Sequence, residues 1–181
     1  MPLLRYKSFL MAKPAKYTVF KTKWGYFGLV ANKKGLLRTC LPCPNRHFIK
    51  HRLLAGLDNP QFDQNLLKPL QDEIIAYFKG KPVRFGVPLA LDGLAPFVRK
   101  VLTACRKIPS GKTVSYSQLA RIIGKPRASR AVGNALAKNP IPLIIPCHRV
   151  IRSDGSPGYF SAPGGADLKA NLLSHEKNQA R

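Results

Sequence analysis

The stretch from Asn139 to Val150 joins a stiff backbone to the most reactive side chains of the chain. Three of its residues are prolines, and proline restricts its own backbone and that of the residue before it. We therefore expect an extended, rigid path that ends on Cys147 and His148. A cysteine becomes a nucleophile when imidazole or cationic neighbours lower its thiol pKa from about 8.5. The pair therefore predicts nucleophilic chemistry at Cys147, with a buried, inert cysteine as the alternative.

A partner for His148 has to come from elsewhere in the chain. Adjacent side chains on an extended chain point apart, so we expect His148 to reach the thiol through a water molecule or a bend. A carboxylate that orients the imidazole would complete a proton relay. Of the three acidic residues beyond position 95, Asp154 is typical of a hairpin turn and Asp167 of a first helical turn. Glu176 is therefore the strongest candidate.

Positive charge dominates the composition of the 181-residue chain. It contains 31 Lys and Arg against 8 Asp and Glu, a formal net charge of +23, and no acidic residue lies between Asp92 and Asp154. A folded body with this bias attracts polyanions, so we predict binding to DNA or RNA with a strong dependence on salt. A generic basic surface and anionic-lipid binding are the alternatives. The second needs a basic amphipathic helix, which we do not find.

Other classes of protein are excluded by composition and patterning. Hydrophobic residues make up 45% of the chain, which is enough for a core. No apolar run approaches the roughly 18 residues of a membrane span, and the first residues lack the apolar region of a signal peptide. Four cysteines are not typical of a secreted disulfide scaffold. We therefore expect no membrane association and a reducing compartment.

Residues 17–87 predict a small unit of sheet and helix, preceded by a loose, basic segment over residues 1–16. β-forming residues around the turn Asn32–Gly35 indicate a meander of strands. Apolar residues at helical spacing indicate two helices, the first with Phe48, Leu53 and Leu54 buried. The expected strands and helices cover Tyr17–Thr22, Trp24–Val30, Leu36–Leu41, His47–Leu57, Pro69–Phe78 and Val83–Val87.

Residues 88–177 predict a second, mainly helical domain that begins with a link over Pro88–Pro96, and residues 178–181 are a tail. Two of its short helices enclose a turn, which is typical of a helix-turn-helix. Leu119, Ile122 and Ile123 should form the buried stripe of the first. The second presents basic and polar side chains outward, so we predict that it contacts DNA, with a solvated basic face as the alternative. These side chains are Arg127, Arg130, Asn134 and Lys138. The expected helices cover Phe97–Arg106, Ser115–Gly124, Ala128–Lys138 and Ala166–His175.

Ordered motifs in this second domain resemble the O6-alkylguanine-DNA alkyltransferase family. They are Ser115-Tyr-Ser-Gln-Leu-Ala120, Asn139-Pro, Pro146-Cys-His-Arg-Val150 and Leu172-Leu-Ser-His-Glu176. The resemblance covers roughly residues 88–177, and the ordered set is specific. It implies an α+β protein with an N-terminal ribonuclease-H-like domain of sheet and helix and a C-terminal helical domain with a winged-helix-like helix-turn-helix. The N-terminal half matches only in this general form.

The resemblance also implies DNA repair by direct reversal of damage. Members flip an alkylated guanine out of duplex DNA and transfer its alkyl group irreversibly, once per molecule, to a cysteine. O4-alkylthymine is a further expected substrate. The partner would be double-stranded DNA carrying O6-alkylguanine, bound by a monomer that needs no cofactor, no metal and no membrane. The location would be the cytoplasm of a bacterium or archaeon, or the nucleus of a eukaryote.

Roles at the reacting centre follow from the same resemblance. Cys147 would accept the alkyl group, His148 would deprotonate it through a water molecule, and Glu176 would orient His148. Asn139 would shape the turn beside the site. Tyr116 would crowd the target phosphate, which promotes rotation of the base, and assist the leaving guanine.

Roles in binding DNA and the base follow in the same way. Arg130 would replace the extruded base in the stack. The family touches the DNA backbone at positions that match Ser117, Lys125 and Ser153. It forms the pocket at positions that match Pro142, Val150, Tyr159 and Ser161. The pocket loop, Gly158–Gly165, is longer than the usual Tyr-x-Gly-Gly of the family.

Two other functions and one other site stay open on the sequence. A lesion-binding or architectural DNA protein would lack the acceptor cysteine, which is present here, and a thiol hydrolase would keep its Cys and His far apart in sequence. Cys40 and Cys43, with His47 and His51 one helical turn apart, have spacing compatible with zinc or a disulfide. Because Cys40 ends an apolar strand, we expect no metal there.

Overall fold

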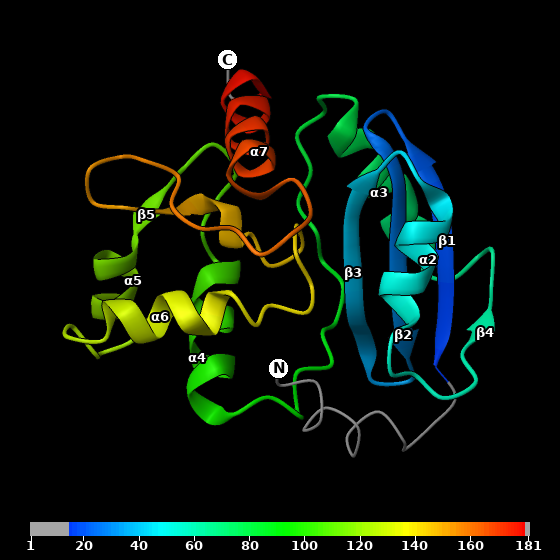
Figure 1. Cartoon of the computed structure of the whole chain (residues 1–181), viewed down its shortest axis with the longest axis horizontal. Coiled ribbons are helices and arrows are strands. Elements are labelled where there is room, and N and C mark those ends of the chain that lie inside the picture. Colours follow the sequence, from blue (N-terminus) through cyan, green and yellow to red (C-terminus); the bar gives the residue numbers. More distant parts are fainter. Residues whose placement is uncertain (1–14, 180–181) are drawn as a thin grey trace. The chain divides into compact units, whose positions relative to one another are not determined.

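The computed structural model describes residues 15–179, so the expectation for the segment before residue 15 lies outside the described residues. The chain divides into two compact units (Figure 1). The first runs to Lys79 and includes Val83–Gly93, and the second comprises Gly80–Pro82 and the chain from Leu94 onward. The first combines a sheet with helices and the second is mainly helical, which confirms the α+β class.

The first unit is built on a mixed sheet with the strand order β3-β2-β1-β4. Strands β1 (Lys16–Thr22), β2 (Gly25–Asn32) and β3 (Gly35–Cys43) form the predicted antiparallel meander. The turn between β2 and β3 falls at the predicted position, and Gly35 adopts φ 131° there, a conformation that favours glycine. A two-residue strand, β4 (Gln61–Phe62), pairs parallel to β1. Strand β4 was not predicted, because two residues are too few to show a period.

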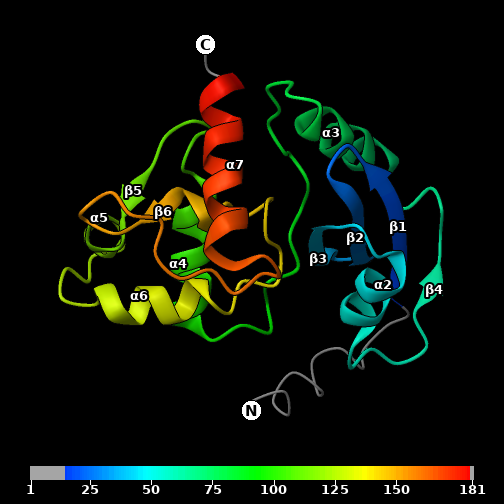
Figure 2. The ribbon, with the colours of Figure 1, turned by 45° about the horizontal axis from the view of Figure 1, so that its top comes forward.

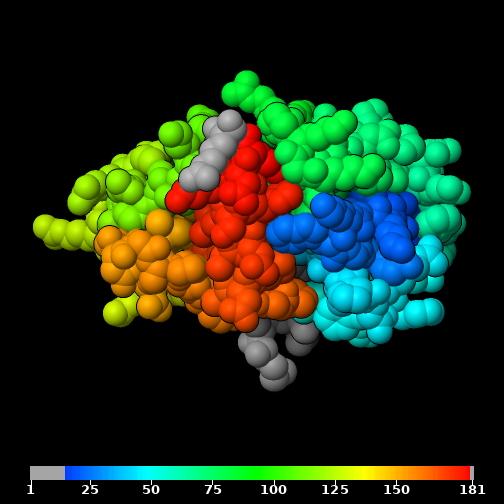
Figure 3. Space-filling model, turned by 90° about the horizontal axis from the view of Figure 1, so that it is seen from above, coloured from blue at the N-terminus to red at the C-terminus, as the bar shows by residue number. Residues whose placement is uncertain are grey.

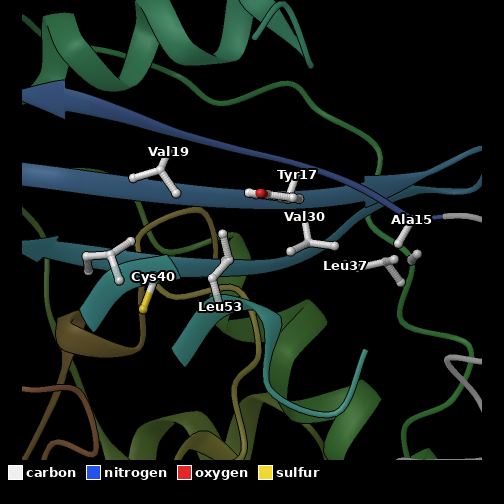
Figure 4. Close-up of a cluster of buried hydrophobic side chains, with 9 residues drawn as sticks. Ala15, Tyr17, Val19, Val30, Leu37, Cys40 and Leu53 are labelled. Carbon is white, nitrogen blue, oxygen red and sulfur yellow. The ribbon is translucent and has the colours of Figure 1, made fainter. Parts of the chain in front are cut away.

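Helices cover both faces of this sheet (Figure 2). Helix α2 (Arg46–Leu54) packs against β2 and β3, and α3 (Lys68–Phe78) packs against β1. The middle of β2 is buried without a break from Phe27 to Ala31, because successive side chains of a strand point to opposite faces and both faces are covered. A Cβ at Gly28 would lie 2.8 Å from Leu53 of α2, so the helix sits directly on the strand. Figure 4 shows the buried cluster under α2, in which Tyr17, Val19 and Val30 meet Leu53.

Two predictions for the first unit were wrong. Phe48 is 42% exposed, whereas Ile49 and Leu53 are fully buried. The phase of α2 is set by this pair one turn apart, which leaves Phe48 on the flank. The expected strand Val83–Val87 is not formed. The residues just after this segment pair with the open edge of β3 instead. The Leu36 amide donates to the Pro88 carbonyl, and the Ala90 amide donates to the Leu36 carbonyl.

The second unit contains the predicted helix-turn-helix. Helices α5 (Tyr116–Ile122) and α6 (Ser129–Leu136) pack on each other and on α4 (Pro96–Arg106). Ser115 caps α5 in a capping box with Gln118, which satisfies free amides of the first turn. Ile122 is 63% exposed, contrary to prediction. As in α2, the buried pair lies one turn apart, at Leu119 and Ile123, and Ile122 falls outside the buried face.

Two further elements complete this unit. Strands β5 (Val114–Ser115) and β6 (Val150–Ile151) pair in parallel, and helix α7 (Gly165–Gln179) packs against the short 3-10 helix η1 (Cys147–Arg149). The loop that leads into α7, coloured orange, lies beside that helix at the surface (Figure 3). Over the part of the chain that the structure describes, no helix is long and apolar enough to cross a membrane.

Candidate active site

The proline-rich segment delivers Cys147 to the interior by a turn. Pro142 and Ile145 form an isolated bridge, and Leu143 between them adopts φ 77°. The expectation of an extended path was therefore wrong for these residues. Proline fixes the first corner of a turn as readily as it fixes an extended chain, and burial of Ile141, Leu143, Ile144 and Ile145 favours the folded form. The turn leads directly into η1, whose first residue is Cys147.

Asn139 ties this turn to the thiol. Its Nδ2 donates to the Ile145 carbonyl at 2.9 Å and to the Cys147 Sγ at 3.1 Å, and its Oδ1 accepts from the Ile141 amide at 3.0 Å. One side chain thus fixes both ends of the turn and touches the sulfur. Burial raises the pKa of the Cys147 thiol, and the hydrogen bond from Asn139 and the charge of Lys169 oppose that rise. The resting group is therefore a thiol, which needs a base before it reacts.

His148 is positioned to supply that base. It is fully buried, and its Nε2 lies 2.9 Å from Glu176 Oε1. Burial alone would raise the pKa of Glu176, but hydrogen bonds and charges from His148 and Arg149 lower it well below its ordinary range. An ionised carboxylate only accepts hydrogen bonds, so Nε2 carries the proton and Nδ1 is the free acceptor. Nδ1 is buried with no hydrogen-bond partner among the described residues.

Arg149 makes contacts that the sequence did not indicate. Its Nε and Nη2 each donate to Glu176 at 2.8 Å, and Nη1 donates to the Ile108 carbonyl. The Gly111 amide adds a further donor to Glu176 at 3.2 Å. Arg149 therefore binds the carboxylate of Glu176, although it lies only two residues after Cys147 in sequence. A bidentate pair also holds the carboxylate in one orientation, so the His148 tautomer is fixed.

Lys169 is a second buried cation that sequence reasoning left without a role. Its Nζ donates to the Val150 carbonyl at 2.6 Å and to the Tyr116 hydroxyl at 3.4 Å, and lies 5.6 Å from the centre of the Tyr116 ring. Burial lowers the pKa of Lys169 to about 8. Burial and the nearby Cys147 raise the pKa of Tyr116. A basic residue among apolar ones in the middle of α7 was the only available signal.

A cavity of about 730 Å³ opens over the thiol. Cys147 and Tyr116 line it together with residues from α6, from the segment after β6 and from the pocket loop. Of the predicted residues, the structure brings Cys147, Tyr116, Arg130, Tyr159 and Ser161 to this cavity. Phe160 of the predicted pocket loop lines it too, and Arg152 and Asn134 line it although they were not predicted as pocket residues. A Cβ at Gly158 would lie 3.2 Å from the Tyr116 hydroxyl, and Gly158 adopts φ 71°, so glycine suits this position.

Other predicted residues are not among those that line this cavity. Pro142 is half-buried in the turn, and Val150 is fully buried in β6, so neither side chain is among the lining residues. Lys125 and Ser153 are exposed in loops of the same unit. The Ser117 hydroxyl lies 2.8 Å from that of Ser115 at the start of α5. Their roles in binding DNA or the base remain predictions.

The possible zinc or disulfide site is not formed. All four cysteines are free, and no group of three or more His, Cys, Asp or Glu within residues 15–179 is placed to hold a metal ion. Cys40 is buried beneath α2, whereas His47 and His51 are exposed on that helix. Opposite sides of one helix cannot converge on a single ion, so the spacing in sequence was misleading.

The fold and site define a class: a two-unit helix-turn-helix protein with a buried cysteine that lines a cavity beside the second helix, α6. Two family models match the chain. Residues 96–178 match the DNA-binding domain of 6-O-methylguanine DNA methyltransferase, and residues 15–91 match its ribonuclease-like domain. The chain belongs to this family.

Individual proteins agree with the family match. A methylated-DNA--protein-cysteine methyltransferase of Methanosarcina barkeri is 39% identical over 171 residues, which cover 91% of this chain and 99% of that protein. One from Methanosarcina acetivorans is 42% identical, over 88% of this chain and 97% of that protein. The crystal structure of Mycobacterium tuberculosis OGT in complex with DNA has a TM-score of 0.77 and 31% identity, over 91% of this chain and 94% of that one.

Proposed function

We propose that this protein repairs DNA by moving the alkyl group of O6-alkylguanine, and of O4-alkylthymine, from a flipped-out base to the sulfur of Cys147. Membership of the family supports DNA repair by alkyl transfer to a cysteine. The single observation that carries the choice of cysteine is the position of Cys147: it alone among the four cysteines lines the large cavity beside α6.

The transfer is a displacement at the alkyl carbon. The thiol proton passes through a water molecule to Nδ1 of His148, the acceptor that the Glu176 and Arg149 contacts leave free. The sulfur then forms a bond to the alkyl carbon while the bond from that carbon to O6 breaks, and the electron pair stays on the base. The Tyr116 hydroxyl, which lines the cavity, donates one proton to the base. The proton that His148 took from the thiol then returns to the Tyr116 oxygen, so both side chains end in their starting states. The net products are a thioether and guanine.

Buried charge supports this chemistry on both sides of the sulfur. The charge of Lys169 opposes the rise in the pKa of Cys147, and its Nζ donates to the Tyr116 hydroxyl in the same cavity. A thioether is a stable product, and nothing in the proposed relay regenerates the thiol. We therefore propose one transfer per molecule, with no metal and no cofactor in the reaction.

We propose that α6 forms the surface that contacts DNA. Arg130 is exposed on this helix at the rim of the cavity, where it can occupy the space that the flipped base leaves in the duplex. Flipping costs a few kcal/mol, and less for a poorly paired lesion. Ser117, Lys125 and Ser153 would contact phosphates, which hold the protein in register without reading sequence.

The state and location of the protein follow from this function. One chain contains the thiol, the relay and the DNA face, so we propose that it acts as a monomer on double-stranded DNA. Its substrate places it wherever the genome is: in the cytoplasm of a bacterium or archaeon, or in the nucleus of a eukaryote.

The mass of the intact protein tests the proposal. Incubation with duplex DNA that contains O6-methylguanine should add one methyl group per molecule, and peptide mapping should place it on Cys147. Cys147→Ala should gain nothing, and Cys105→Ala, which removes the buried cysteine of α4, should still gain one group. Label on any other cysteine, or many transfers per molecule, would overturn the assignment.

Loss of Arg130 tests the flipping step separately. Arg130→Ala should slow transfer from a base-paired lesion by roughly 10- to 100-fold, since the few kcal/mol of unstacking lose their compensation. Transfer from a lesion in single-stranded DNA, where no stack has to be opened, should change much less. Arg121→Ala, which removes an exposed arginine of α5 to which we assign no contact, is the matched control. Equal slowing on both substrates would contradict the role.

A further inference from the structure

A second hollow in the C-terminal unit has no part in the proposed reaction. It is a groove of about 670 Å³ between the outer face of α4 and the end of α5, and none of its lining residues lines the cavity over Cys147. Its residues are Pro96, Arg99, Lys100, Thr103, Ala104, Lys107, Ile108, Pro109, Lys112, Val114, Ile122 and Ile123. None of the residues to which we assign a contact with DNA lines the groove either.

The groove combines an apolar floor with a cationic rim. Ile108 and Ile123 are buried at its base, and Ile122 stands 63% exposed at its side. Four of the lining residues are Arg or Lys, and none is acidic. Apolar surface in contact with water is unfavourable in free energy, so an exposed isoleucine beside a hollow is typical of a surface that a binding partner covers. The arrangement fits a ligand that is apolar in the middle and negative at its edges.

Duplex DNA does not match that description. Phosphates placed over an isoleucine floor would lose water without gaining hydrogen bonds, and a duplex presents no apolar side chain to fill the hollow. An amphipathic peptide does match, since a Leu, Ile or Phe can enter the hollow while flanking carboxylates meet the cations. The spacing of the cations along α4, at Arg99, Lys100 and Lys107, extends over about two helical turns, the length of a short peptide helix.

We propose that this groove of α4 and α5 docks an acidic, amphipathic segment of a partner protein while α6 holds DNA. Charge complementarity selects the partner, and Ile122 and the floor beneath it receive its apolar anchor. The groove would thus couple a lesion-searching protein to other machinery on the same DNA without competing for the cavity.

Peptide selection on the protein–DNA complex tests this. A random library of peptides about 15 residues long, roughly four helical turns, is displayed and selected on the full chain bound to undamaged duplex. The enriched peptides should carry several Asp or Glu around Leu, Ile or Phe. In NMR spectra they should shift amide signals of Thr103, Ile108 and Ile122 first. Enrichment of neutral or basic peptides, or no enrichment over a bead control, would overturn the proposal.

Variants decide whether the groove is the binding site. Ile122→Glu and Lys100→Glu should each weaken an enriched peptide by about tenfold or more, the loss expected for an anchor residue, and should leave methyl transfer at the wild-type rate, which shows that they fold. Lys177→Glu makes the same change of charge at an exposed site on α7 and should have little effect. If Lys177→Glu weakens binding equally, general charge attraction is responsible. If duplex DNA displaces the peptide from these residues, the groove belongs to DNA. Either result refutes peptide docking.

Discussion

The two units bury different kinds of polar side chain. In the first unit the buried polar residues are neutral: Thr18, Thr22, Thr39 and Gln71. In the second they all ionise: His148, Arg149, Lys169 and Glu176. Burial of a charge costs several kcal/mol unless it is paired and hydrogen-bonded. The first unit therefore uses polar groups to complete hydrogen bonds, whereas the second holds charges where they can act on Cys147.

If the buried charges of the second unit act together, the substitution with the largest effect on stability and transfer should be at Glu176. Glu176→Gln removes the only acidic partner that the described residues give to buried Arg149 and His148, so we expect the free energy of unfolding to fall by about 3–5 kcal/mol. The rate of methyl transfer should fall by roughly 100-fold, because the His148 tautomer is no longer fixed. Urea unfolding and single-turnover transfer measure the two effects.

The control for Glu176 lies on the same helix. Asp167→Asn makes the same change at an exposed position in the first turn of α7 and should alter both quantities only slightly. A loss of less than about 1 kcal/mol in Glu176→Gln, the range of a surface ion pair, would mean that the buried charges are not coupled as the contacts indicate.

The next effect is expected at Lys169. Lys169→Met keeps the length of the buried chain and removes its charge, so transfer should slow by about 10- to 100-fold while the protein becomes no less stable. The pKa of Lys169, about 8, should also appear in the pH profile. In the wild type the rate should stop rising near that pH, where the cation is lost, and Lys169→Met should lack this limb. An unchanged profile would remove Lys169 from the chemistry.

Acid should destabilise the second unit in two steps. Burial lowers the pKa of His148, and its partners lower the pKa of Glu176, so in both cases the unfolded chain binds protons before the folded one does. Stability is therefore present at neutral pH and falls first below about 6.5 and again below about 4.3, the ordinary His and Glu values. Urea midpoints measured from pH 7.5 down to about pH 2.5 cover both steps. His148→Gln should lose the upper step alone.

The smallest effect should come from the first unit. Gln71 donates to the carbonyls of Gln64 and Leu66 at 2.9 and 2.8 Å. Gln71→Leu leaves both acceptors unsatisfied, and we expect a loss of about 1–3 kcal/mol in the free energy of unfolding with no change in the rate of transfer. A slower transfer in the folded variant would show that the first unit takes part in the chemistry, and the contrast between the units would fail.

The local sequence pattern was sufficient to locate most helices and strands, but not to predict which side of each helix is buried. The meander, α3, α4, α6 and the capped start of α5 fall where the sequence predicts them. The predictions failed for Phe48 and Ile122, which lie next to the buried face of their helices. In a short helix one residue decides whether a side chain lies inside or on the flank, and the packing partner makes that choice.

The sequence by itself determined the charge of the protein and the order of most of its elements. It also indicated Glu176 as the partner of His148, because acidic residues are so scarce in the second half. Only the tertiary structure placed Arg149 on Glu176 and Lys169 beneath Tyr116, and turned the segment before Cys147 back on itself. The physical reason is that a buried charge chooses its partner by distance and orientation. Residues 27 or 53 positions apart along the chain acquire those only when helices and turns have packed.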